Sequence, residues 1–468
     1  MRRLARLTAL ALLAALIAVP LGAAATRMWI GFHDDPSFRW EPDRTSMLDR
    51  AKASNATMFR AVVTWADVAK TKPANASNPF DPAYRLDDVD QLVRDAQQRG
   101  MEVLLTIWGT PKWANGGKGP AFLPRNINDL TTFSKALAQR YSGRYAGFPY
   151  VRFYSVWNES NLQLFLAPQF DSKGRSVGPA LYAKLYAAAY AGIKAGNSKA
   201  QVAIGETSSH GRDKALRGQS GTHSPGRFAQ LVAKANPRLK FDAWAHHPYP
   251  YPVNMKPTQL VRWPNVSLAS LPRFEKSLDV WFKRKGVQIW ITEYGHETKP
   301  GEPAGVSESQ QASYIKQALS IVKKDQRVQM FVWFVFQDTK TSLWQSGLYR
   351  LTGAAKPGRA AFASAAKSLD ARNAIVRAKA GTRPTVRVSV REFAALNKPG
   401  AKIGITWKLT QGRGVVAVKQ PQVALGIDGW VTFKVDYPLK KKTTYTLTVD
   451  ANDVNGLTTR RVLSLTGV

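Results

Sequence analysis

Short apolar runs alternate with amphipathic segments from about residue 27 to residue 372. Apolar runs bounded by turn residues predict buried strands, and an apolar period of three to four residues predicts helices. Strands are expected at 28–32, 57–65, 102–108, 151–159, 201–206, 241–247, 287–293 and 328–336. Helices are expected at 46–53, 86–99, 127–141, 179–195, 226–235, 271–285, 308–323 and 359–369. Eight strand–helix units predict a parallel sheet, and their number fits a (β/α)8 TIM barrel of the α/β class.

A doubly wound open sheet is the alternative arrangement of such units. It should carry a glycine-rich turn after an early strand, and the sequence has none. Beyond Arg383 the helical period stops and short alternating runs replace it, at 385–390, 403–407, 430–435, 444–449 and 458–465. We therefore expect a barrel domain at 26–377 and an all-β, immunoglobulin-like sandwich domain at 383–468.

The first 25 residues have the pattern of a signal peptide. Three arginines among the first six residues precede an apolar run at 7–21, and Ala23-Ala24-Ala25 offers a cleavage site. An uncleaved membrane anchor is the alternative, but the run is short for a spanning helix and contains Pro20. We expect a secreted protein with no stable membrane insertion after cleavage. The chain has no cysteine, which excludes thiolate chemistry and cysteine metal sites.

The chain is strongly basic, with 67 Lys and Arg against 32 Asp and Glu and a net charge of +35. Such a charge favours acidic partners, which include nucleic acid, anionic lipid and acidic cell-wall glycans. The charge is spread along the chain, and no zinc-finger spacing or helix-turn-helix pattern accompanies it, so we do not expect nucleic-acid binding. An anionic extracellular glycan or association with a cell wall is consistent with the charge, and so is a solvated basic surface.

Two predicted strands end in glutamate. The fourth ends in Asn158-Glu159 and the seventh in Glu293. In a TIM barrel the carboxyl ends of the strands form the active face, and strands four and seven lie roughly across its mouth. Two carboxyl groups there can flank one glycosidic bond. A separation of about 5 Å supports a covalent intermediate and retention, and about 6.5–9.5 Å leaves room for water and gives inversion.

These strand ends resemble those of clan A glycoside hydrolases, especially families 5 and 39. The resemblance rests on Trp157-Asn158-Glu159 and on Ile291-Thr292-Glu293-Tyr294-Gly295, and it covers the barrel only. It implies that Glu159 is the acid/base and that Glu293 is the nucleophile of a retaining enzyme. Glu159 would then have to hold a proton in the free enzyme.

Other positions match the same pattern. Arg60 on strand two looks like the arginine that these enzymes hold near the nucleophile, and His247-Pro248-Tyr249 resembles their His-x-Tyr on strand six. Trp333 stands where they have a platform tryptophan, although Phe336 and Gln337 depart from the pattern there. The strand-three histidine of family 5 is absent, with Trp108 nearby instead.

The residue types suggest roles in binding a sugar. Arg60 would keep Glu293 ionised, Asn158 could bond a sugar hydroxyl, and Tyr249 or Tyr294 could bond the nucleophile. Aromatic side chains that could stack on sugar rings are Trp108, Trp113, Trp333 and Trp344. The predicted substrate-binding residues are Arg60, Trp108, Asn158, Glu206, His247, Tyr249, Tyr294 and Trp333. His246 and His247 lack a third ligand at suitable spacing, so we expect no metal and no cofactor.

Together these features predict a secreted retaining glycoside hydrolase that acts on a poly- or oligosaccharide through two glutamates. The alternative is a non-catalytic carbohydrate-binding or wall-associated protein on a degenerate barrel. The presence of both glutamates at matching strand ends favours the enzyme. The sandwich could bind glycan or pack on the barrel, and its Trp407 and Trp430 lie in alternating runs that favour packing.

Overall fold

The structure is a computed structural model that describes residues 27–468 apart from 218–219, 341–343, 374 and 395. The signal peptide expected at 1–25 lies outside the described residues. Eight parallel strands close into a barrel, in the order β1, β2, β3, β4, β5, β8, β9 and β10 around the ring. They are Trp29–His33 (β1), Met58–Thr64 (β2), Glu102–Trp108 (β3), Phe153–Val156 (β4), Gln201–Ser208 (β5), Ala243–His247 (β8), Gln288–Tyr294 (β9) and Val328–Phe334 (β10). The predicted TIM barrel is confirmed, and the open sheet is excluded.

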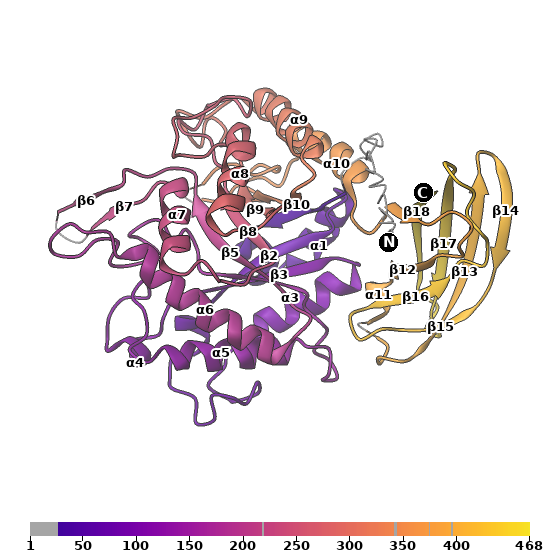
Figure 1. Ribbon diagram of the computed structural model, residues 1–468, viewed down its shortest axis with the longest axis horizontal. Coiled ribbons are helices and arrows are strands. Elements are labelled where there is room, and N and C mark those ends of the chain that lie inside the picture. The colour runs from indigo at the N-terminus through magenta and orange to yellow at the C-terminus, as the bar shows by residue number, and fades with distance from the viewer. Residues whose placement is uncertain (1–26, 218–219, 341–343, 374, 395) are drawn as a thin grey trace, which may run out of the picture.

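Helices follow the strands and cover the outside of the barrel (Figure 1). The long ones are α1 (Arg44–Ala53), α3 (Asp87–Gln98), α5 (Ile127–Arg140), α6 (Gly178–Gly196), α7 (Pro225–Ala235), α8 (Leu271–Trp281), α9 (Glu308–Lys324) and α10 (Pro357–Leu369). Short elements lie in the connections: η1 (Pro36–Trp40), α2 (Trp65–Val68), α4 (Lys112–Asn115), the hairpin of β6 (Lys214–Leu216) and β7 (Ser220–Thr222), and η2 (Leu268–Ser270). Within the described part of the chain, no helix is both long and apolar enough to span a bilayer.

The side chains that point into the barrel form an apolar layer below a polar one. The lower layer includes Trp29, Met58, Leu104, Phe153, Trp290 and Met330. Above it the Arg60 Nε donates to Thr106 at 3.0 Å, and Thr106 bonds Ser155 at 2.8 Å. Because a buried polar group without a partner costs free energy, these bonds let polar side chains occupy the interior. The polar layer lies toward the carboxyl ends of the strands.

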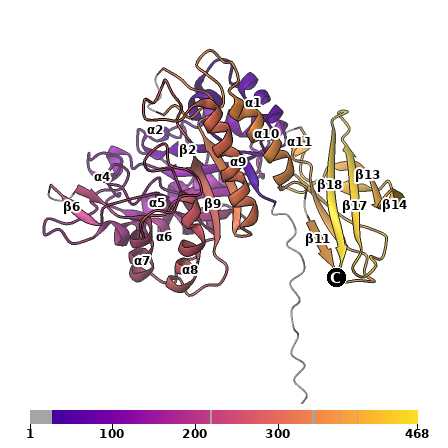
Figure 2. The same cartoon turned by 90° about the horizontal axis from the view of Figure 1, so that it is seen from above.

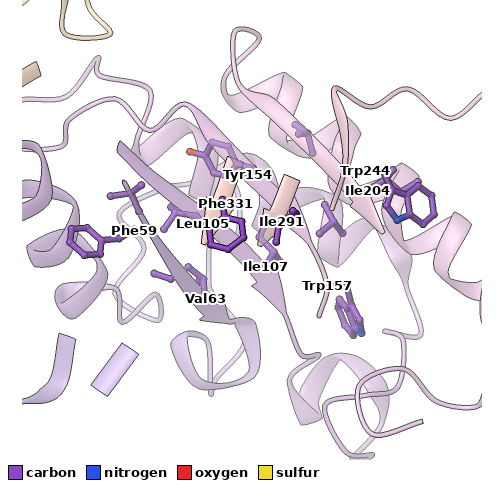
Figure 3. Packing of buried hydrophobic residues seen from close by; sticks show 14 of the residues in the cluster. Phe59, Val63, Leu105, Ile107, Tyr154, Trp157, Ile204, Trp244, Ile291 and Phe331 are labelled. Atoms are coloured by element: carbon purple, nitrogen blue, oxygen red, sulfur yellow. The ribbon is translucent and has the colours of Figure 1, made fainter. Parts of the chain in front are cut away.

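The opposite sides of the same strands form the larger core. Phe59, Val63, Leu105, Ile107 and Ile204 alternate with the inward residues and pack in one buried cluster with the helices (Figure 3). Alternation of side chains along a strand produces these two separate cores.

The C-terminal segment forms a second lobe beside the barrel (Figures 1 and 2). Its elements are β11 (Ile375–Ala378), β12 (Thr385–Ser389), α11 (Arg391–Ala394), β13 (Lys402–Gln411), β14 (Gly414–Lys419), β15 (Gln422–Ala424), β16 (Trp430–Lys434), β17 (Thr444–Asn452) and β18 (Thr458–Gly467). β11, β18, β17, β13 and β14 form one sheet, with β15 paired to β13, while β12 pairs with β16 in another. These largely antiparallel sheets fit the predicted sandwich. β11 pairs with β18, although three of its four residues, 375–377, fall in the range 26–377 expected for the barrel.

The lobe contacts the amino-terminal ends of the barrel strands, opposite the polar layer. Trp430, the first residue of β16, belongs to the same buried cluster as the lower interior residues of the barrel. Arg391 pairs with Glu102, the first residue of β3, at 2.7 Å, and donates to the Tyr150 carbonyl at 2.5 Å. Both charged side chains are buried. Trp407, by contrast, lies in the lobe's own core.

Candidate active site

Two bulges turn carboxylates toward the barrel interior. The register of β9 against β10 shifts between the pairs Ile291–Phe331 and Tyr294–Trp333, so Thr292 and Glu293 together oppose one residue. A shift in β5 leaves Glu206 as the extra residue between Gly205 and Thr207. Bulges of this kind re-aim side chains near functional sites. Glu206 also has a positive φ of 46°.

The turn after β4 places the other glutamate. Trp157 and Glu159 adopt φ angles of 74° and 35°, a left-handed region that non-glycine residues seldom occupy. The Trp157 indole is buried and donates to the Phe165 carbonyl at 2.6 Å, which holds the turn. Between them, Asn158 accepts a bond from Arg60 Nη2 at 2.9 Å through its Oδ1. The Asn158 amide nitrogen is thus the group that can donate to a sugar hydroxyl.

Arg60 joins the strands beneath the mouth. Arg60 is the third residue of β2 and not its last. Because neighbouring strands are staggered, it still lies beside His33, the last residue of β1. Its guanidinium pairs with Glu293, contacts Asn158 as described, and lies 3.3 Å from Glu206. An arginine provides such a fork of donors in a fixed geometry. One buried cation on the second barrel strand therefore holds side chains from the fifth and seventh strands and from the turn after the fourth.

Glu293 is held ionised by its surroundings. His33 Nδ1 lies 3.2 Å from Oε1, and the Tyr249 hydroxyl donates to Oε2 at 2.9 Å. Burial would raise the pKa of Glu293, but the charges of His247 and Arg60 hold this pKa well below its usual value. A carboxylate that stays charged and carries no proton is suited to attack a carbon.

His247 lies between three carboxylates. Its Nδ1 is 3.2 Å from Glu159 and 3.5 Å from Glu293, and its Nε2 is 2.7 Å from Glu206. Although burial lowers the pKa of an imidazole, the charge of Glu293 and the bonds to Glu159 and Glu206 raise the pKa of His247 to about 9. The ring is thus an imidazolium at neutral pH, with donors toward both sides.

Three of the predicted substrate-binding residues do not face the mouth. Tyr294 points outward, where its hydroxyl bonds His296 at 2.8 Å, so Tyr249 and not Tyr294 holds Glu293. Trp333 is buried in the outer core and donates to the Ser346 carbonyl at 2.9 Å, which excludes it as a sugar platform. Glu206 is wholly buried beneath His247, so it positions other side chains and cannot touch a sugar.

The other aromatic candidates divide between the mouth and the core. Trp108, at the end of β3, is half-buried and lies edge-on to Trp157. Trp344 lies against Tyr249, with ring centroids 4.8 Å apart. Trp113 packs on Trp65 and donates to a backbone carbonyl, away from the glutamates.

Two further side chains of the mouth, His33 and Phe334, are not among the predicted substrate-binding residues, and their rings lie 5.0 Å apart. Alternation along β10 could have found Phe334. Val332 faces the interior, so Phe334 does too and Trp333 does not. His246, the other histidine considered above as a metal ligand, faces outward and bonds Thr207 at 2.9 Å. The described residues contain no cluster of three or more side chains arranged to hold a metal ion.

Comparison with known proteins agrees with this geometry. Residues 24–337 match the sequence model of Cellulase, glycosyl hydrolase family 5. None of the curated proteins matches the chain. Among solved structures, a family 39 glycoside hydrolase from Bacteroides cellulosilyticus WH2 shares 16% identity over 87% of this chain and 79% of its own, with a TM-score of 0.53. A GH5_18 protein from Streptomyces cattleya, in complex with GlcNAc, shares 15% identity over 76% of this chain and 86% of its own, also with a TM-score of 0.53.

At these identities the two structures show a common fold, whereas the family match covers more than half of the chain. The resemblance of the strand-four and strand-seven motifs to clan A enzymes is thereby confirmed. The chain belongs to glycosyl hydrolase family 5 and is a clan A glycoside hydrolase.

Proposed function

We propose that the protein is a secreted retaining glycoside hydrolase in which Glu293 is the nucleophile and Glu159 the acid/base. The observation that carries the proposal is the His247 nitrogen shared by the two carboxylates. His247 Nδ1 lies 3.2 Å from Glu159 Oε1 and 3.5 Å from Glu293 Oε2. The two oxygens can therefore be no more than about 6.7 Å apart, and they are closer than that unless the three atoms lie on one line. Such a separation favours direct attack over attack by an intervening water.

The reaction would proceed in two steps. In the first, Glu293 attacks the anomeric carbon while Glu159 gives its proton to the glycosidic oxygen, and the leaving-group sugar departs. In the second, the Glu159 carboxylate takes a proton from water, the resulting oxygen attacks the same carbon, and Glu293 is released. The His247 imidazolium lies beside both carboxylates, so it stabilises the negative charge that passes from Glu293 to Glu159 during the first step.

Two observations support a substrate class, and a third supports export. A variant of the Streptomyces cattleya GH5_18 protein, with a TM-score of 0.53, is described in complex with Manβ1-4GlcNAc, which supports a β-linked sugar here too. The net charge of +35 supports an anionic poly- or oligosaccharide, including one of a cell wall. The apolar run at 7–21 after an arginine-rich start supports export.

Azide rescue of alanine variants tests the assignments. Wild type, Glu159→Ala and Glu293→Ala are incubated with aryl β-glycosides and polysaccharides, and the exposed Glu41→Ala serves as a control that should behave as wild type. Glu159→Ala should lose about 10²–10⁴-fold on substrates with poor leaving groups, whose departure needs the acid. On aryl glycosides with good leaving groups the second step limits the rate, and azide should restore that rate by taking the place of water and forming the β-glycosyl azide. Glu293→Ala should be inactive, and azide should give the α-glycosyl azide.

Product configuration gives an independent answer. NMR of the first sugar released by wild type should show the β-anomer before mutarotation. Release of the α-anomer would exclude retention, and unchanged hydrolysis by Glu293→Ala would exclude that residue as the nucleophile. Binding of glycans by wild type without cleavage of any of them would favour the non-catalytic alternative.

A further inference from the structure

A side pocket adjoins the active site. It has a volume of about 300 Å³ and is formed by the chain after β5, at Ser209 and His210, and by the long connection after β8. The pocket shares Tyr249 with the site, and the hydroxyl of this residue holds Glu293. It therefore lies next to the side chain that holds Glu293.

The pocket lies on the side of Glu159. The chain that leads into Ser209 and His210 is tied to the turn that carries Glu159, because the Ser208 backbone nitrogen donates to Asn161 Oδ1 at 2.8 Å. If Glu159 protonates the glycosidic oxygen, as proposed above, the sugar beyond that oxygen lies on the same side. The pocket is then placed to receive the leaving-group sugar, and this step rests on the proposed function.

The pocket wall offers a stacking surface. The rings of His210 and Tyr251 are stacked, with centroids 4.1 Å apart and planes 15° from parallel. Tyr251 is 60% exposed, and Leu260, also in the wall, is 70% exposed. Aromatic and aliphatic surfaces that a folded protein leaves open beside its active site are suited to the apolar face of a sugar.

The charge of the wall is one-sided. Arg262 lines the pocket, and none of the described residues that line it is an aspartate or a glutamate. Some exposed arginines have carboxylate partners, as Arg175 has in Asp171 and Arg460 in Asp450, but no carboxylate of the described residues forms an ion pair with Arg262. Its planar guanidinium is left to bind a carboxylate from outside the chain.

We propose that this pocket is a leaving-group subsite for an acidic sugar, a uronate, whose ring lies against His210 and Tyr251 and whose carboxylate Arg262 binds. The substrate is accordingly a glycan with a uronate on the reducing-end side of the cleaved bond. This agrees with the excess of positive charge on the chain.

Direct binding of monosaccharides tests the proposal without requiring hydrolysis. Dissociation constants for matched pairs, glucuronate with glucose, galacturonate with galactose and mannuronate with mannose, are measured by ligand-observed NMR on the full chain. At least one uronate should bind wild type about tenfold or more tightly than its neutral partner, the usual gain for a charge-assisted bond. Arg262→Gln should abolish this difference. Lys256→Gln removes the same charge from an exposed residue of the same connection outside the pocket wall, and it should preserve the difference.

The outcomes separate the two proposals. Equal binding of acid and neutral sugars in every pair, or a preference that survives in Arg262→Gln, would overturn the uronate subsite, whatever the enzyme hydrolyses. The protein could instead prefer uronates through Arg262 and yet cleave no glycoside. That result would uphold the subsite and count against the proposed reaction alone. In an active enzyme, uronates should also accept the glycosyl group from Glu293 better than neutral sugars, and Tyr251→Ala should weaken transfer to both.

Discussion

At the scale of single residues, two neighbours at the end of β9 point to opposite sides of the barrel wall. Regular alternation after Trp290 would have turned Tyr294 inward and Glu293 outward. The bulge at Thr292 and Glu293 reverses this, so the carboxylate enters the mouth and the phenol leaves it. A bulge depends on pairing with another strand and has no signature in the local sequence, which is why Tyr294 was misassigned.

This arrangement predicts a contrast between two tyrosine variants. Tyr249→Phe removes the hydroxyl that donates to Glu293 Oε2 at 2.9 Å, and kcat should fall about 10–100-fold, as expected for a lost bond to a charged group. Tyr294→Phe removes a hydroxyl bonded to His296 in the outer core and should leave kcat unchanged. Steady-state kinetics on one aryl glycoside measure both. An equal loss of kcat in the two variants would contradict the structural assignment.

The imidazolium of His247 predicts a loss of stability in alkali. Its pKa rises from 6.5 to about 9 on folding, so its contribution is complete below pH 6.5 and is lost as the pH rises through about 9. The shift corresponds to about 3 kcal/mol. Urea unfolding at pH 6, 8 and 10 should show the loss in wild type. His247→Gln has no proton to lose there, so its free energy of unfolding should fall less between pH 6 and 10. A parallel decline in the two proteins would refute the role given to this ring.

At the scale of elements, β16 serves two cores. Its Trp430 lies with the lower interior residues of the barrel, while Val431 and Phe433 lie in the core of the sandwich. The alternating pattern predicted that Trp407 and Trp430 would both be buried, but it could not show in which core. That distinction arises from how one lobe docks on the other, through contacts between residues far apart in sequence.

Removal of the Trp430 indole should therefore weaken the barrel although the residue belongs to the sandwich sheet. We expect Trp430→Ala to lower the free energy of unfolding by about 3–5 kcal/mol, the usual cost of deleting a large buried side chain. Trp40→Ala, at a residue that is 60% exposed, should change it little. The measurement is urea unfolding, monitored through the loss of hydrolysis because hydrolysis reports on the barrel. A change in Trp430→Ala as small as in the control would show that the barrel does not need this contact.

At the scale of the whole molecule, the count and order of the barrel elements were predictable because they depend on local periodicity. Each predicted long helix is present, Glu159 follows the fourth barrel strand, and Glu293 is the last residue but one of the seventh. What escaped prediction depends on pairing at a distance: the bulges of β5 and β9, the strands β11, β14 and β15, and the burial of Glu206. The net charge of +35 can be counted from the sequence, but only the fold shows that Arg262 lines a pocket.

The indole of Trp430 at the lower end of the barrel also limits how this protein could be rearranged in evolution or by design. A catalytic barrel whose accessory domain is joined by a free linker can exchange that domain for another. Here the accessory lobe supplies part of the barrel's interior and the buried partner of Glu102. A substitute domain would have to bring both groups to the same positions, so the two lobes are expected to be inherited together and to change sequence in step.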